Sequence, residues 1–135
     1  MITMTKNLKY FSGLTMIFSA LFFYNLHSAL QTQSYDNIWI FAVLYGAILF
    51  CTGLFLGYKD SVRKSRADLG FQYHLMTFII VNGIGIPWMF ISIGLKTETL
   101  LSASIQFVSW GIGLFVHYYF SSRSLKGMNK EEVFI

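Results

Sequence analysis

The sequence is short of charge, cysteine and proline, and each shortage excludes a class of protein. Charged residues make up only 12% of the 135 residues, whereas hydrophobic residues make up 55%. A soluble domain normally carries about 25% charged residues, and one of this length could not bury so much apolar surface. The single cysteine, Cys51, offers no disulfide framework, and the single proline leaves room for long helices. The composition therefore predicts a protein whose solvent is lipid.

Charge is missing altogether from four long apolar stretches. Each stretch has close to the ~20 residues that a helix needs to cross ~30 Å of hydrocarbon. No alternation typical of strands is present, so the stretches are predicted to be helices. The expected fold is all-α: an integral membrane four-helix bundle built from two helical hairpins, with residues 1–135 as a single membrane domain. The predicted spans are residues 10–30, 37–57, 71–93 and 100–121.

The first span also resembles a signal peptide, because Lys6 and Lys9 precede its apolar run. Cleavage would require a small-x-small pattern near Ser28 and Ala29, which Leu30 interrupts. We therefore expect this span to be retained as a transmembrane helix.

The basic residues gather on one side of the predicted topology. Basic residues precede the first span and recur in the connection 58–70 and in the tail 122–135. The connection 94–99 between the third and fourth spans contains a single basic residue, Lys96. Cytoplasmic segments carry the excess of Lys and Arg. The sequence thus predicts a multi-pass protein of the cytoplasmic membrane with both termini inside. The cations on that side are Lys6, Lys9, Lys59, Arg63, Lys64, Arg66, Arg123, Lys126 and Lys130.

The connection 58–70 is expected to form a basic surface at the cytoplasmic face, made by Lys59, Arg63, Lys64 and Arg66. Asp60 and Lys64 are spaced for an acid-before-base pair on a helix. The favoured interpretation is a solvated helical continuation, and the alternative is a docking surface for a partner. Nucleic acid is not expected as a partner, because the basic residues are few and split over three segments.

Small residues recur on one face of the second span. Ala42, Gly46, Gly53 and Gly57 follow at steps of four, seven and four. Such a face lets helix backbones approach closely. Packing inside the bundle is the favoured interpretation, and contact between two copies of the chain is the alternative.

The third and fourth spans carry polar residues at matched depths. A short hairpin over residues 94–99 brings His74 opposite His117, Asn82 nearly opposite Trp110, and Gly85 opposite Gln106. Asn82, Trp110 and Gln106 are thus predicted to form a polar ladder between helices, since polar groups in lipid seek partners. Small residues at Ser109 and Gly113 are expected to let the two backbones approach.

His74 and His117 admit three interpretations. The favoured one is a structural pair, and the alternatives are a pH or ligand sensor, or ligands of a metal or haem b. Two histidines supply only half of a tetrahedral metal shell. Helices packed about 8–10 Å apart also leave little room for a haem between them. We therefore expect no cofactor.

Residues 66–121 carry motifs that resemble the bacterial two-transmembrane domain family. Phe71-x-x-His74-Leu75 and then Asn82 match that family's first helix, and Trp110-Gly-x-Gly-Leu-x-x-His117 matches its second. Ser109 stands where the family has a leading glycine, and the tail lacks the family's Trp-then-basic pattern. The resemblance implies a membrane hairpin without assigned biochemistry, found alone or fused to sensor kinases or DNA-binding domains.

Enzyme, exporter and channel chemistry lack their required residues. No span supplies a carboxylate for proton coupling, a nucleophile with an activating partner, or a charged ring. The sequence predicts a non-enzymatic membrane subunit or regulatory partner, in contact with lipid and with another membrane protein or a second copy. The alternative is a redox protein or sensor that uses His74 and His117.

Overall fold

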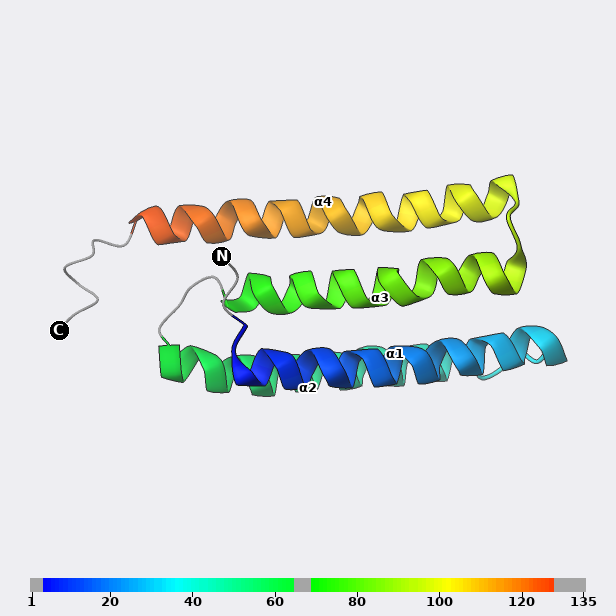
Figure 1. The fold of residues 1–135 in the computed structure, drawn as a ribbon, viewed down its shortest axis with the longest axis horizontal. Coiled ribbons are helices and arrows are strands. Elements are labelled where there is room, and N and C mark those ends of the chain that lie inside the picture. The colour runs from blue at the N-terminus through cyan, green and yellow to red at the C-terminus, as the bar shows by residue number, and fades with distance from the viewer. Residues whose placement is uncertain (1–3, 65–68, 128–135) are drawn as a thin grey trace.

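Four helices make up the described part of the chain, residues 4–64 and 69–127 of the computed structural model. They are α1 (Lys6–Thr32), α2 (Ile38–Lys64), α3 (Leu69–Ile93) and α4 (Thr97–Gly127) (Figure 1). Each contains a segment long and apolar enough to cross a membrane: Lys6–Thr32, Ile38–Asp60, Leu69–Ile93 and Thr97–Phe120. The predicted all-α, four-helix membrane fold is confirmed.

The helix ends follow local chemistry. Thr5 precedes α1, and its hydroxyl accepts a hydrogen bond from the Leu8 amide at 3.0 Å, the usual role of an N-cap. α1 ends at Thr32, and the next residue, Gln33, adopts the left-handed conformation with φ of 53°. Gly94 has φ of 94° between α3 and α4, a conformation that glycine adopts without steric penalty. These turns produce two tight hairpins.

The helices form an open array. α1 packs against both α2 and α3, and α4 packs against α3; across the described residues α4 does not contact α1 or α2. Figure 1 shows α3 between α4 and the pair formed by α1 and α2. Both tight turns lie at one end of the molecule, which we call the hairpin end. The opposite end, where α1 begins and α2 terminates, is called the Asp60 end.

α1 contributes one of its faces to the buried core. Leu8, Phe11, Thr15 and Ser19 are buried and lie three or four residues apart, hence on one face of the helix. The Phe11 ring packs 4.9 Å from the ring of Tyr73 on α3. The small hydroxyl residues on this face allow α1 to lie close to its neighbours.

The small-residue face of α2 is only partly used within the chain. A Cβ at Gly53 would lie 3.3 Å from the Phe11 ring, and one at Gly57 would lie 3.9 Å from Tyr73. Ala42 is exposed, and a Cβ at Gly46 would meet nothing within 4 Å. The prediction of internal packing is therefore wrong for Ala42 and Gly46. In this part of α2 the contact with α1 is made by Tyr45, whose ring stacks 4.7 Å from that of Phe22. The small-residue face of α2 therefore points away from α1 here.

Two helices extend beyond their predicted spans. α2 continues past Gly57 to Lys64, and α4 continues to Gly127. The predicted helical continuation in the connection 58–70 is thus confirmed as far as Lys64. Pro87 lies inside α3, which remains a single helix.

Candidate functional site

The carboxylate of Asp60 joins three helices at the Asp60 end. Asp60 lies near the end of α2 and is only 4% exposed. Its Oδ1 accepts a hydrogen bond from the Asn7 side chain at 2.8 Å, and its Oδ2 accepts one from the Tyr73 hydroxyl at 2.9 Å. The Thr5 hydroxyl also donates to Oδ2. We call these four residues the Asp60 cluster.

The Asp60 cluster places a negative charge at the N-terminus of α1. α1 has no acidic residue in its first turn, although the N-terminus of a helix carries a partial positive charge. Asp60 supplies an acid there from a different helix. Its hydrogen bonds from Thr5, Asn7 and Tyr73 offset the loss of water around a buried carboxylate.

Sequence reasoning missed this cluster. The sequence predicted that Asp60 would be exposed to solvent on a helical continuation of the second span. This is wrong, because α2 extends far enough to bury the Asp60 carboxylate against α1 and α3. The available signal was spacing: Gly53, Gly57 and Asp60 lie four and three residues apart and share one helical face. Because that face was predicted to pack against other helices, Asp60 could have been predicted to be buried.

A groove of about 670 Å³ opens between α2 and α3 beside the Asp60 cluster. It exists because α2 and α3 both lean on α1 and contact each other only sparingly. Gly53, Gly57 and Gly70 widen it, since they place no side chain in the walls. Its other lining residues include Phe11, Phe50, Leu54, Tyr73, His74 and Thr77.

His74 lines this groove, and its ring packs against that of His117 on α4. Their ring centroids are 5.0 Å apart and their planes are tilted by 74°. The hairpin alignment predicted this proximity. His117 also stacks near Phe71 at 6.3 Å, and its Nε2 would lie 3.8 Å from a Cβ at Gly70. Thus α4 meets the first turns of α3 through aromatic rings.

The histidine contact restricts the chemistry that the pair can perform. An edge-to-face contact leaves no gap for a porphyrin between the rings. Among the described residues, no group of three or more His, Cys, Asp or Glu could hold a metal ion. No hydrogen bond to either imidazole is found in that part of the chain, so both rings retain capacity for another partner. Whether the pair is structural or a sensor stays a prediction.

The polar ladder between α3 and α4 has a different register from the one predicted. Gln106 donates to Asn82 at 3.4 Å, while the Asn82 amide donates to the Phe78 carbonyl at 2.8 Å. Trp110 instead packs edge-on against Phe78 at 5.9 Å. The predicted Asn82–Trp110 partnership is therefore wrong by one helical turn. Gly85 faces away from α4, because a Cβ there would lie 2.6 Å from Phe23 of α1.

Close backbone approach at Ser109 and Gly113 is not observed. Ser109 is exposed and donates to the Gln106 carbonyl at 3.2 Å. A Cβ at Gly113 would meet nothing within 4 Å. The prediction is wrong because rings such as those of Phe78 and Phe107, 5.0 Å apart, separate α3 from α4.

The predicted basic surface is described only at Lys59. That residue is exposed, and its ammonium group lies 4.0 Å from the centre of the Phe55 ring. The side chains of Arg63 and Lys64, and all of Arg66, lie outside the described residues. The surface itself stays a prediction.

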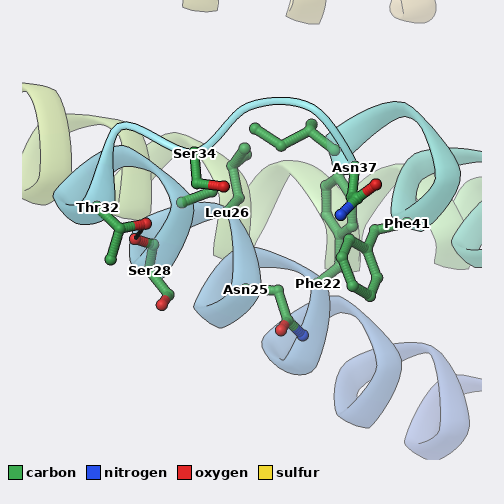
Figure 2. Close-up of a pocket in the computed structure, with 10 residues that line it drawn as sticks. Phe22, Asn25, Leu26, Ser28, Thr32, Ser34, Asn37 and Phe41 are labelled. Carbon is green, nitrogen blue, oxygen red and sulfur yellow. Dashed lines mark hydrogen bonds between the residues drawn. The ribbon is translucent and has the colours of Figure 1, made fainter.

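A smaller pocket of about 190 Å³ lies at the hairpin end, between the end of α1 and the start of α2 (Figure 2). Its lining side chains are uncharged. Asn25 and Thr32 bond to carbonyls of their own helix, those of Leu21 and Ser28. It is therefore a weaker candidate than the groove beside Asp60.

The Asp60 end thus combines a hydrogen-bonded carboxylate with an apolar groove that an imidazole helps to line. Such an arrangement can anchor helices and bind an apolar or amphipathic molecule. Comparison of the chain with family models, curated proteins and solved structures gives no match.

Proposed function

We propose that the chain is a non-enzymatic protein of a bacterial cytoplasmic membrane that acts as a subunit or regulatory partner of another membrane protein. The observation that carries the proposal is the outer face of α4. Large apolar side chains recur there at alternating steps of four and three residues, the spacing of a helix–helix seam. The seam consists of Leu101, Ile105, Val108, Ile112 and Phe115, which are 56–67% exposed.

This seam lies opposite the face that α4 turns toward α3. Gln106, Trp110 and His117 contact α3, whereas the seam residues are offset by about half a helical turn. Within the described residues, α3 is the only helix that packs against α4. A helix of another membrane protein would complete the packing of α4 on its second side.

The orientation of the protein rests on its charges. α1 begins and α2 ends at the Asp60 end, where Lys6, Lys9 and Lys59 lie. At the hairpin end, the connection between α3 and α4 contains one basic residue, Lys96. The Asp60 end is therefore proposed to be cytoplasmic, with both termini inside.

The resemblance to the bacterial two-transmembrane domain family supports a regulatory role. Its motif residues lie on the α3–α4 hairpin, where Phe71, His74 and His117 meet. In that family the hairpin also occurs fused to regulatory modules, which is consistent with action through a partner protein.

Photocrosslinking in native membranes tests the proposed partner. A photoreactive residue replaces Ile112 in the α4 seam, and the matched control replaces Val43, which is 62% exposed on α2. We expect one discrete protein adduct from position 112 that position 43 does not form. Seam variants Ile105→Ala and Phe115→Ala should weaken it. No adduct, or identical adducts from both positions, would contradict the proposal.

Accessibility of introduced cysteines tests the orientation. In a Cys51→Ser background, Ser34→Cys at the hairpin end should react with a membrane-impermeant maleimide added outside intact cells. Lys6→Cys at the Asp60 end should react only after the membrane is opened. The reverse pattern would show that the Asp60 end faces outward.

A second candidate function is sensing by His74 and His117, favoured by their ring contact. Two imidazolium cations at this distance would repel, so protonation of both would loosen the contact between α3 and α4. As the pH is lowered, the histidine NMR shifts should then change together with the α3–α4 distance. Flat shifts would eliminate sensing of pH.

The redox alternative has its own readout. A haem protein shows a Soret band, which should disappear in His74→Ala or His117→Ala. A preparation from the native membrane without such a band would exclude haem at this pair.

A further inference from the structure

The groove between α2 and α3 has no role in the proposed function, yet its size is that of a ligand site. Its volume of about 670 Å³ lies within the roughly 300–1,000 Å³ of small-molecule sites. Both helices line it within their membrane-spanning segments, Ile38–Asp60 and Leu69–Ile93. Along α2 it runs from Leu49 to Tyr58, about 14 Å at 1.5 Å per residue. An extended apolar tail suits this length and these surroundings.

Aromatic rings in the walls of the groove favour a cation. Phe11, Phe50, Tyr58 and Tyr73 line it, and the faces of such rings are electron-rich and attract cations. The Tyr73 hydroxyl donates a hydrogen bond to Asp60 Oδ2 at 2.9 Å. A phenol that donates to a carboxylate gains electron density in its ring. The Tyr73 ring therefore attracts a cation more strongly than an ordinary tyrosine ring does.

The charges of α2 near the groove favour a cation as well. Gly57 lines the groove, and Asp60 lies three residues further along the same helical face. The carboxylate is thus on the groove side of α2, one hydrogen bond behind Tyr73. Lys59 lies two residues from Gly57, about 200° around the helix, and its ammonium group lies over the Phe55 ring. The negative charge of α2 faces the groove, and the positive charge of Lys59 faces away.

The two described lysines of α1 also lie away from the groove. α1 lines the groove through Phe11. Lys9 is two residues from Phe11, about half a turn around the helix. The Lys6 ammonium lies 5.8 Å from the centre of the Tyr10 ring, which is exposed. Within the described residues, the charge that acts on the groove is therefore the carboxylate.

We infer that the groove binds a single-chain amphipathic organic cation with a quaternary ammonium head. The tail lies along α2 beside Leu54, and the head lies against the Tyr73 ring at the Asp60 end. The oxygens of Asp60 already accept from Thr5, Asn7 and Tyr73. A quaternary head suits this carboxylate, because it has no N–H group that needs an acceptor. The inference goes beyond the proposed function and does not depend on a protein partner at α4.

Probes that differ in charge test the ligand class. Decyltrimethylammonium, its uncharged isostere with carbon in place of nitrogen, and decanoate are added separately to the full chain in maltoside micelles. Probe concentrations are expressed relative to detergent, and the pH is about 8, where an ordinary imidazole is neutral. By NMR titration, the cation should shift the Tyr73 resonances and bind about tenfold more tightly than the isostere, equivalent to about 1.4 kcal/mol. Equal binding of the two, or a preference for decanoate, would overturn the inference.

Asp60→Asn tests the source of the preference. It removes the charge but keeps a side-chain oxygen that can accept from Tyr73. The preference for decyltrimethylammonium over its isostere should fall severalfold. Thermal unfolding without any probe establishes that the variant is folded. A folded Asp60→Asn protein with the full preference would overturn the role of the carboxylate.

A matched pair of variants locates the tail. Leu54→Trp fills the groove and should weaken decyltrimethylammonium binding about tenfold. Leu44→Trp, on the same helix but outside the groove, should leave binding unchanged; the two leucines are 59% and 52% exposed. Equal losses in both variants would overturn the site.

Crosslinking of the unmodified protein avoids any effect of substitution on folding. An alkyltrimethylammonium with a photoreactive group in its tail should label the α2 segment 49–58, and an excess of decyltrimethylammonium should prevent the labelling. Labelling confined to α4, or equal protection by the uncharged isostere, would overturn the inference.

Discussion

α1 and α4 are both long apolar helices, yet they occupy opposite positions in the molecule. α1 packs against two neighbours and fully buries Leu8 and Ser19, whereas α4 packs against α3 alone in the described structure. Both helices are apolar enough to cross a membrane. Apolarity therefore does not decide how many neighbours a helix packs against. The difference arises from side chains that let backbones approach and from polar contacts between helices.

The polar contacts that α1 makes with its neighbours are shorter than the one described here between α3 and α4. The Ser19 hydroxyl lies 2.7 Å from that of Tyr45 on α2, and His27 lies 3.0 Å from the Ser92 hydroxyl on α3. The Asp60 cluster adds further links at the start of α1. Between α3 and α4, Gln106 donates a longer hydrogen bond of 3.4 Å to Asn82. Substitutions around α1 should therefore have larger effects than substitutions in α4.

The largest effect is expected from Asp60→Ala. It removes the common acceptor of Thr5, Asn7 and Tyr73, and leaves the buried Thr5 and Tyr73 hydroxyls and the half-buried Asn7 amide without this partner. The free energy of unfolding in bicelles should fall by about 3 kcal/mol. Asp36→Ala, in the exposed connection after α1, is the control and should change it by less than about 0.5 kcal/mol. Equal effects would show that Asp60 does not hold α1 in place.

A smaller effect is expected from Gly85→Ala. The added Cβ would lie 2.6 Å from the Phe23 ring, and that ring is held against Trp88 at 5.2 Å. Overpacking between α1 and α3 should destabilise the protein by about 1–2 kcal/mol. Gly83→Ala is the control, because its Cβ would meet nothing within 4 Å. If both variants unfold alike, α1 does not press on α3 at this point.

Ser19→Ala should cost less again. It removes the hydrogen bond to Tyr45 and should lower the free energy of unfolding by about 0.6–1 kcal/mol. A double-mutant cycle with Tyr45→Phe isolates the coupling of the two hydroxyls. Ser104→Ala, exposed on α4, should be neutral. A coupling of zero would remove this contact as a reason for the packing of α1 against α2.

The smallest effect is expected in α4, from Gln106→Leu. Its hydrogen bond to Asn82 is long, so a cycle with Asn82→Leu should show a coupling of at most about 0.6 kcal/mol. The same unfolding measurement reads both cycles. A coupling larger than that of Ser19 with Tyr45 would reverse the comparison between α1 and α4.

Local arguments predicted some features of the site and failed for others. Hairpin geometry correctly brought His74 to His117, because a short turn ties their depths together. The same argument misplaced Gln106, since ring packing sets the register within a turn. Asp60 was missed because its partners come from α1 and α3, distant in the sequence. The sequence did not predict the groove either, because the groove depends on the separation of α2 and α3 in the folded protein.

By itself the sequence determined four membrane-spanning helices joined as two hairpins. Charge cannot remain in hydrocarbon, and backbone groups there must bond within their own helix. The tertiary structure alone decided that, in the described residues, α1 packs against two helices, that α4 packs against one and that Asp60 is buried. Apolar helices are nearly equivalent to one another in lipid, so their order depends on the fit of small residues, rings and hydrogen bonds across helices.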